Sequence, residues 1–432
     1  MQTYNKKSLL VLATSLLIFG CQDEAYNFAS DSDTSSQDTS DGSTSTSNET
    51  SVATYDCSET DETQYDIVLS QGYGDNAYQL LANGSGDNVL LDTDSFADAL
   101  AEAYLQMPFS SDSDATTIGS ILIAADGTMS ADLQLKVPSY TVLNVCSTIT
   151  ASDDYASGDK AVIYARERTN ISIPNLTLAG SPRYGIFMRS VSNIELGNIT
   201  MALDKTPNIL DGVRIDNNPG KDNVRITNVT ADVVNISGTT RHAFETYGVD
   251  GLTIDSFVAS NTGYSGLMLN DTVNAEINTL TCTNCADASS GYAALRIANN
   301  AGLIDNEWPE GNIHVKSMTA TDGDRGIFAV SNSGGLTIDS VMLTGQNQQA
   351  ILIQSSHNIV IASDSGTITD QPIYITTQSG YDNASDITFS NLTLEGTAYI
   401  QENSGLCSDD LNNRAQNIAI AGAGSVTMCF SD

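Results

Sequence analysis

The chain has 432 residues, of which 53 are acidic and 17 are basic, giving a formal net charge of −36. A chain this acidic excludes nucleic acid as a partner, because neutralising phosphates requires a basic surface. About 375 residues follow the polar N-terminal region, which is long for one globular core but ordinary for a repeat protein that grows by adding coils.

The first 20 residues predict a secretory signal peptide. Lys6 and Lys7 precede an apolar run at 9–19 that is too short to span a bilayer as a stable helix. The sequence ending at Cys21 resembles a bacterial lipobox, which implies lipidation of Cys21, and Gln22 resembles the next residue of lipoproteins sent to the outer membrane. The resemblance implies a lipid anchor in the bacterial outer membrane, on its surface or periplasmic face; an ordinary cleaved signal peptide is the alternative.

Residues 21–55 are rich in Ser, Thr and Asp and predict a disordered tether, because they have too little apolar surface to offset their conformational entropy. Within the folded domain, we expect irregular structure at 56–93. Apolar residues then recur at helical spacing over 95–105, and this predicts an α-helix that caps a solenoid. The predicted domain is 56–432, with an N-terminal cap at 56–116, coils at 117–425 and a C-terminal cap at 403–432.

The second half of the chain repeats one pattern with a period of about 23 residues. A small residue opens a short alternation of apolar and polar residues, as in Gly185-Ile186-Phe187-Met188-Arg189, and a turn residue such as Asn193 opens the next one. Short strands at a fixed period predict an all-β fold, a parallel β-helix of about ten coils. The turn residues are Asn170, Asn193, Asn223, Gly251, Asn274, Asn312, Gly335, Asn358, Asp386 and Asn417.

The passage at 119–128 and 137–143 resembles the opening coil of the pectate-lyase-like superfamily of right-handed parallel β-helices. The resemblance covers about 117–425 and depends on the repeat pattern rather than on a catalytic signature. It implies a single-stranded right-handed parallel β-helix and a carbohydrate substrate. It carries no active-site residue over to this chain.

Aligning the coils on their first strand separates inward from outward positions, because successive side chains of a strand point to opposite faces. Ile186 and Met188 then point inward, and the strand 242–246 is predicted to place Glu245 inward at the position of Met188. A buried Glu bonded to turn backbone is the interpretation that this alignment favours.

Six cysteines of the folded domain predict disulfides, because the chain is exported. Fifteen pairings are possible. Order along a solenoid favours Cys57–Cys146, Cys282–Cys285 and Cys407–Cys429.

Most of the arginines fall on or beside one outward column of strands, and this predicts a groove for an anionic chain, since guanidinium binds carboxylates bidentately. Pairing of each Arg with an acidic residue of the next coil is the alternative. The predicted binding residues are Arg183, Arg189, Asp216, Asn270, Arg296, Arg325 and Tyr264.

Two chemistries fit the polar segment 238–251. In β-elimination from a uronic-acid polymer such as alginate or pectate, Arg214 and Arg241 would neutralise the carboxylate, His242 would be the base and Tyr247 would donate to the leaving oxygen. Elimination is the preferred hypothesis. Hydrolysis needs a carboxylate pair, for which the candidates are Asp211, Asp216 and Glu245.

The known signatures of related folds are missing: this chain has no Gly-His-Gly, and Arg296-Ile297-Ala298 stands where polygalacturonases have Arg-Ile-Lys. A non-catalytic polysaccharide-binding or adhesin-like β-helix is therefore a third hypothesis. The sequence requires no cofactor and leaves Ca²⁺ open, because its acidic loop residues lack tight ligand spacing. These residues are Asp287, Asp305, Glu307, Glu310, Asp322 and Asp324. We expect a monomer whose partners are an acidic polysaccharide and the membrane that holds its lipid.

Overall fold

The structure is a computed structural model that describes residues 55–428, except 59, 73–76, 87, 108–118, 220–223, 289–290 and 404–408. Internal contacts divide the chain into two units, and the second, Ala53–Asp432, contains all of the described residues. The predicted signal peptide, Cys21, nearly all of the tether and the predicted Cys407–Cys429 pair lie outside them.

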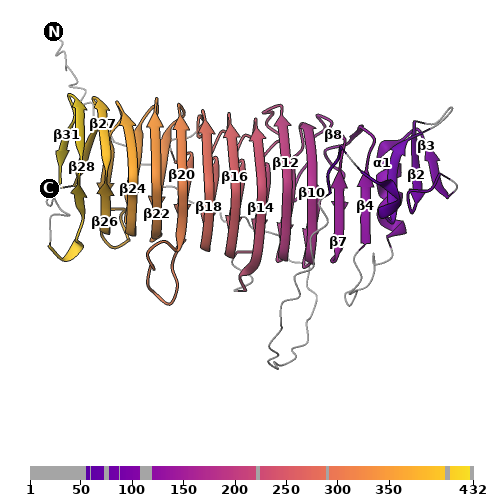
Figure 1. Cartoon of the computed structure of the whole chain (residues 1–432), viewed down its shortest axis with the longest axis horizontal. Coiled ribbons are helices and arrows are strands. Elements are labelled where there is room, and N and C mark those ends of the chain that lie inside the picture. The colour runs from indigo at the N-terminus through magenta and orange to yellow at the C-terminus, as the bar shows by residue number, and fades with distance from the viewer. Residues whose placement is uncertain are drawn as a thin grey trace, which may run out of the picture. The chain divides into compact units, whose positions relative to one another are not determined.

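The second unit is a right-handed parallel β-helix in which strands of successive coils lie side by side (Figure 1). The prediction of the fold class is confirmed. Among the described residues, sheet B has 12 strands, so the stack has about two coils more than expected. Its strands are β6 (Leu135–Lys136), β9 (Ala161–Arg166), β11 (Tyr184–Arg189), β13 (Val213–Asp216), β15 (Phe244–Tyr247), β17 (Leu267–Asn270), β19 (Leu295–Ala298), β21 (Arg325–Val330), β23 (Gln349–Gln354), β25 (Ile373–Thr376), β28 (Tyr399–Glu402) and β31 (Ser425–Thr427).

Sheet A holds the longer strands of each coil and continues into the N-terminal cap. Its strands are β1 (Ile67–Gln71), β2 (Tyr78–Ala82), β3 (Val89–Thr93), β4 (Gly119–Ile123), β5 (Gly127–Met129), β7 (Thr141–Val145), β8 (Thr148–Ala151), β10 (Thr169–Gly180), β12 (Ser192–Leu203), β14 (Ile226–Ser237), β16 (Val249–Ser260), β18 (Val273–Thr283), β20 (Ile313–Thr321), β22 (Gly334–Thr344), β24 (His357–Thr369), β26 (Ser385–Ser390), β27 (Leu392–Gly396), β29 (Arg414–Gln416) and β30 (Ala419–Gly422).

Alternation along each strand builds the core inside the coils. In β12, Ile194, Leu196 and Ile199 are fully buried, and they meet the equivalent residues of neighbouring rungs. Each buried apolar side chain contributes about 25 cal/mol per Å² of area removed from water, which makes this core the main stabilising force.

The recurrent Asn residues stabilise the turns between the two sheets. Asn170 and Asn193 have φ angles of 57° and 54°, in the left-handed region that Asn tolerates better than most residues. Their side chains also form a ladder, with Asn193 Nδ2 donating to Asn170 Oδ1 at 3.1 Å. Of the predicted turn residues that the structure describes, all but Asn312 have a positive φ, so the period seen in the sequence reflects a backbone requirement of most coils. Asn223 lies outside the described residues, and Asn228 continues the ladder from Asn193.

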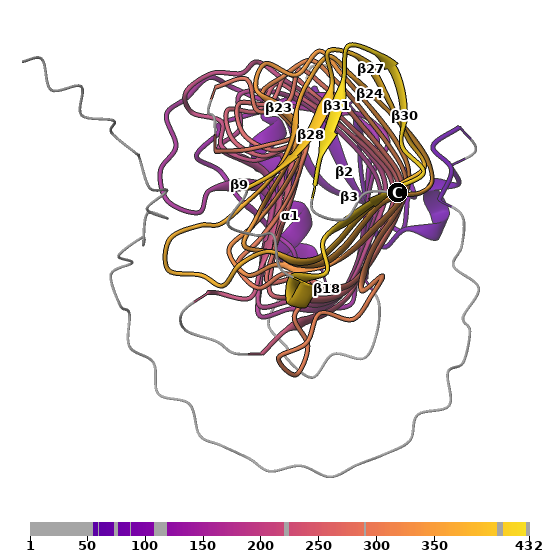
Figure 2. The ribbon, with the colours of Figure 1, turned by 90° about the vertical axis from the view of Figure 1, so that its left-hand side faces the viewer.

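The N-terminal cap combines a small sheet with one helix. The expectation of irregular structure at 56–93 is wrong. β1 pairs antiparallel with β2, and β2 with β3, while β1 also pairs parallel with β4 of the first coil. The predicted helix is present as α1 (Phe96–Gln106), with Ser95 as its N-cap, and it lies within the outline of the coils when they are seen end-on (Figure 2). Its residues Phe96 and Leu100 join the main core, so α1 covers the apolar end of the stack.

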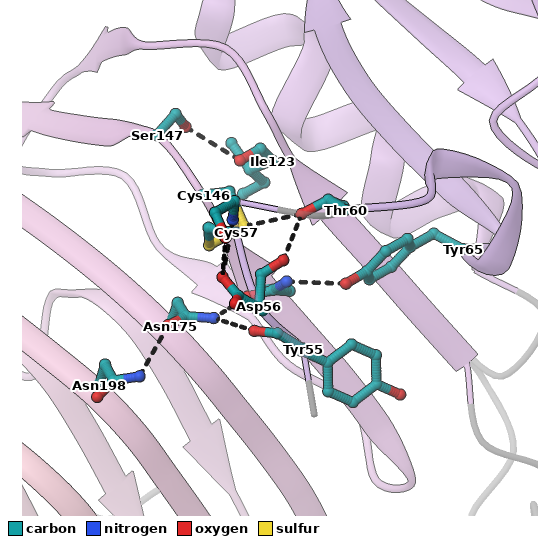
Figure 3. The surroundings of a disulfide bond; sticks show 12 residues. Tyr55, Asp56, Cys57, Thr60, Tyr65, Ile123, Cys146, Ser147, Asn175 and Asn198 are labelled. Atoms are coloured by element: carbon teal, nitrogen blue, oxygen red, sulfur yellow. Dashed lines mark hydrogen bonds between the residues drawn. A yellow bond between two sulfur atoms is a disulfide. The ribbon is translucent and has the colours of Figure 1, made fainter. Parts of the chain in front are cut away.

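A disulfide fastens the start of the domain to the first coils, as Figure 3 shows. Cys57 bonds to Cys146, and beside it Asn175 donates to the carbonyl oxygen of Tyr55 at 2.7 Å. A second disulfide joins Cys282 to Cys285. Both predicted pairings are confirmed. Within the described part of the chain, no helix has the length and apolar character that crossing a membrane requires.

Candidate functional site

Glu245 lies on the outer face of sheet B, so its predicted inward position is wrong. The register pairs Glu245 with Arg214 of β13 and with Met268 of β17, while Phe244 and Thr246 point inward. The small residue that opens this strand is Ala243, whose carbonyl accepts from the amide of Val213, and not His242 as the alignment assumed. A shift of one residue moves every side chain of a strand to the other face.

Arg214 is the centre of a buried cluster of charges. Its Nε lies 2.8 Å from Asp216 Oδ2, and its Nη1 lies 2.8 Å from Glu245 Oε2 and 3.9 Å from Asp211 Oδ2. The side chains of both aspartates have no exposed surface, and that of Glu245 is 10% exposed. The cluster thus brings together all three carboxylates that the sequence offered for hydrolysis.

Asp216 holds two arginines together. Arg189 donates to both of its oxygens, from Nε at 2.6 Å and from Nη2 at 2.9 Å, and a further nitrogen lies 3.0 Å from Asp159 Oδ2. Burial by itself would raise the pKa of Asp216, but the hydrogen bonds from Arg189 and the charge of Arg214 lower it below its usual value. Asp216 is therefore an ionised structural counter-ion.

In contrast to Asp216, Glu245 and Asp211 have raised pKa values. Burial is the main cause that raises the pKa of Glu245 to about 7, opposed by Arg214 and reinforced by the charges of Asp211 and Asp216. Burial also raises the pKa of Asp211, against the charge of Arg214 and a hydrogen bond from the amide of His242. Because two close buried carboxylates resist being ionised together, we assign the shared proton to Glu245.

The ring of His242 is neutral and its accepting nitrogen is occupied. Burial, followed by the charges of Arg296, Arg214 and Arg241, lowers its pKa well below the usual value. Its Nδ1 accepts from the amide of Ser265 at 3.2 Å, so the single ring proton lies on Nε2. This geometry leaves His242 no lone pair with which to act as the predicted base.

Two tyrosines form an aromatic pair beside His242. The rings of Tyr264 and Tyr292 stack with centroids 4.0 Å apart, and the ring of His242 packs edge-on against both. Arg241 lies 6.0 Å from the centre of the Tyr264 ring, and Arg296 lies 5.1 Å from that of Tyr292. Tyr264 was predicted; Tyr292 was missed, because it lies in a long loop outside the repeat.

The predicted groove of exposed positive charge is not what the structure displays. Arg189 and Arg214 are paired with acidic residues, and Arg325 bonds to the side chains of Gln349, Gln348 and Asp324. The alternative considered from the sequence, pairing with an acidic residue of the next coil, therefore holds for Arg189 and Arg214, whereas the acidic partner of Arg325 is its neighbour in the chain, Asp324. The physical reason is burial, since the side chains of Arg189 and Arg325 are 6% and 9% exposed and a buried charge needs a partner.

The remaining predicted residues lie around this cluster. Asn270 donates from Nδ2 to Glu245 Oε1 at 3.0 Å and so fixes the carboxyl group. Tyr247 is in register with Asp216 and Asn270, two residues beyond Glu245 on the same face. Arg183 donates to the carbonyl of Gly158 at 2.8 Å, and its charge is one of those that oppose the rise in the pKa of Asp211.

Ca²⁺ does not fit this cluster. One potential ligand atom each from Asp211, His242 and Glu245 lies within 4.8 Å of the others, and this is the group with metal-ligand spacing among the described residues. Calcium takes six to eight oxygen ligands, however, and the guanidinium of Arg214 already supplies the positive charge beside both carboxylates. Of the predicted acidic loop residues, Asp287 pairs with Lys205 and Asp324 with Arg325.

A scan of protein-family models and a search of curated proteins find no match to this sequence. Among solved structures, the chain is similar to the A-module of the Azotobacter vinelandii mannuronan C-5 epimerase AlgE4, with 12% identity, a TM-score of 0.40, and coverage of 73% of this chain and 91% of that one. It is also similar to the A-module of AlgE6 from the same organism, with 13% identity, a TM-score of 0.44, and coverage of 78% and 94%. Neither likeness carries a functional residue over to this chain.

Proposed function

We propose that the protein is a polysaccharide-cleaving enzyme, a glycoside hydrolase whose general acid is Glu245. The carrying observation is that a carboxyl group with a pKa near 7 lies on the outer face of sheet B, with a second carboxylate within 4.8 Å. A general acid must hold its proton at the working pH and then release it, which a pKa near neutrality permits.

In this mechanism Glu245 donates its proton to the glycosidic oxygen as the bond to the sugar breaks. Asp211 is the second carboxylate, and its negative charge keeps the proton on Glu245. Hydrolases that retain configuration have carboxyl groups about 5 Å apart, which agrees with this pair. Asp211 has no exposed surface here, so its direct attack on a sugar requires substrate to displace the groups that cover it.

Two features of the cluster, and the charge of the chain, favour hydrolysis over the elimination expected from the sequence. His242 uses Nδ1 to accept from a backbone amide, and Arg214 is paired with carboxylates of the protein rather than available to one of the substrate. A net charge of −36 also repels an anionic polymer at long range.

Elimination from a uronic-acid polymer remains a second candidate because of Arg241 and Arg296. These cations lie against the stacked rings of Tyr264 and Tyr292, where a uronate could rest on the rings and pair with a guanidinium. In that reaction Glu245 would be ionised and would abstract the proton.

One experiment separates the two reactions. The purified chain is incubated with neutral and acidic polysaccharides while new reducing ends and new unsaturated ends are followed across pH. Hydrolysis with Glu245 as acid predicts reducing ends without unsaturated ends and a rate that falls as pH rises through about 7. Unsaturated ends, with a rate that rises through the same pH, would support elimination instead. If no polysaccharide gave either kind of product, the hypothesis of a non-catalytic polysaccharide-binding protein would remain.

Export from the cytoplasm is part of the proposal. The two disulfides, Cys57–Cys146 and Cys282–Cys285, are typical of oxidising compartments. We further propose lipidation at Cys21, which predicts incorporation of labelled fatty acid that the variant Cys21→Ala loses.

A further inference from the structure

An open groove lies on a different face of the solenoid, along the outer surface of sheet A near its C-terminal end. It has a volume of about 720 Å³ and is lined by residues of β24, β26 and β29 and by the loop that contains Trp308. These three strands are consecutive rungs, since Val360 pairs with Thr388 and Thr388 with Arg414. With rungs about 4.8 Å apart, the groove follows the solenoid axis and suits a linear ligand.

Trp308 is held rigidly at the edge of this groove. Its indole nitrogen donates to the carbonyl of Asn332 at 3.0 Å, and its own carbonyl accepts from Asn358 Nδ2 at 2.7 Å. Its ring packs on His357 with centroids 4.1 Å apart. An aromatic ring fixed in this way is a preformed platform that loses little conformational entropy on binding.

Beside the platform stand short polar side chains with donors and acceptors. Asn358, then Asp386 with Thr388, and then Asn412 belong to three successive rungs, and Asn412 Nδ2 donates to Asp386 Oδ1 at 2.9 Å, which orients the carboxylate. His357 beneath them is 7% exposed; its Nδ1 lies 3.0 Å from Ser385 Oγ, and its Nε2 is buried without a hydrogen-bond partner. The ring of Trp308 and the row of polar side chains beside it together suit a ligand with one apolar face and many hydroxyl groups.

The charge of the groove selects among such ligands. Its lining includes the carboxylates of Glu307, Glu310 and Asp386, and none of the described residues that line it is Lys or Arg. Arg414, which is in register with Thr388 on the next rung, donates to the side-chain oxygen of Asn412. An anionic sugar would be repelled here, whereas a neutral sugar would keep every contact.

We propose that this groove is a binding site for a neutral oligosaccharide, separate from the cluster around Glu245. The pyranose ring stacks on Trp308, and its hydroxyl groups bond to Asn358, Asp386 and Thr388. The proposal concerns binding alone, so it stands or fails independently of the reaction assigned to Glu245. Its consequence for an active enzyme is that a second stretch of glycan is held on another face of the same solenoid.

The composition of the chain supplies the test, because Trp308 is the single tryptophan among 432 residues. Neutral gluco-, xylo-, manno- and galacto-oligosaccharides are titrated into the full chain carrying Glu245→Gln, while tryptophan emission is recorded. A saturable change with one neutral series supports the proposal. It is overturned by no change with any of them, or by a response to uronate oligosaccharides or CaCl₂ only.

Matched variants distinguish binding from a loop rearrangement. Thr388→Val keeps the shape of the strand and the fluorophore while removing one hydroxyl, and about a three- to tenfold weaker affinity is expected for one lost hydrogen bond. Thr253→Val makes the same change on the exposed face of β16 and should leave affinity unchanged. Trp308→Ala, measured by calorimetry, should weaken binding at least about tenfold. Equal effects of Thr388→Val and Thr253→Val would overturn the assignment.

Discussion

Two clusters of opposite charges on the solenoid use similar groups in different surroundings. On sheet B, Arg214 is buried with Asp211, Asp216 and Glu245. On the outer face of sheet A, His314 bridges Glu276 at 3.1 Å and Asp339 at 2.8 Å, with side chains that are a quarter or more exposed. In the exposed cluster ion pairing outweighs burial, so the pKa of His314 is raised and that of Glu276 is lowered, whereas in the buried cluster desolvation raises the pKa of two carboxyl groups.

The comparison shows that pairing alone does not make a reactive group. Although burial lowers the pKa of His314, the hydrogen bonds and charges of Asp339 and Glu276 raise it overall. Glu245 also has a cationic neighbour, yet burial and two nearby aspartates raise its pKa to about 7. Water around the exposed cluster is the physical difference, because solvent screens charges and lowers the cost of ionisation.

The largest expected effect is the loss of activity in Glu245→Gln. The amide keeps the size of the side chain but has no proton to transfer, so we expect turnover to fall by about 10²- to 10⁴-fold. The measurement is the initial rate of product formation on the polysaccharide that the wild type cleaves. Glu276→Gln, in the exposed cluster, is the matched control and should retain wild-type activity; equal losses in both would remove Glu245 from the mechanism.

The second expected effect is on stability, in Asp216→Asn. This variant removes the counter-ion that Arg189 and Arg214 share, and breaking a buried ion pair typically costs about 3–5 kcal/mol. Calorimetric unfolding of the wild type and of Asp216→Asn measures the difference in their free energies of unfolding. Asp159→Asn removes the more exposed partner of Arg189 and should cost under about 1 kcal/mol. If both variants were destabilised alike, burial would not be what separates the clusters.

The third prediction concerns the pH dependence of activity in Asp211→Asn. The negative charge of Asp211 raises the pKa of Glu245, so its removal lowers that pKa and Glu245 loses its proton at a lower pH. The alkaline limb of the pH–rate profile, measured on the activity that remains without the second carboxylate, should therefore move to lower pH. Asp255→Asn, on the exposed face of sheet A, should leave the limb in place. An unmoved or raised limb in Asp211→Asn would contradict the proposed coupling.

The fold was predictable because its physical causes recur in every coil. Inward Ile186 and Met188 and the left-handed Asn193 follow from alternation and turn geometry that the sequence repeats. The site was less predictable because it departs from that repeat. At β15 the small residue is Ala243 rather than Gly, and choosing His242 as the first residue of the strand placed Glu245 on the wrong face.

Long loops and short polar residues explain what else was missed. Tyr292 and Trp308 each belong to a long loop whose path does not follow from the period of the repeat. The groove also uses Thr388 and Asn412, residue types that occupy many outward positions of the solenoid. Only the three-dimensional arrangement shows that these few lie beside the single tryptophan.

The smallest expected effect is the pH-dependent stability that His314 contributes. Its folded pKa is raised, so the stabilisation is fully present below the unfolded value of about 6.5 and is lost as pH rises through the folded value. His314→Gln should therefore lower the melting temperature at about pH 6 and leave it unchanged at about pH 9, with an effect under about 1 kcal/mol because the pair is partly exposed. Ser317→Ala, exposed on the same strand, is the control. A loss that was equal at both pH values would mean that His314 acts through packing, and the contrast between a screened and a desolvated cluster would then lose its exposed member.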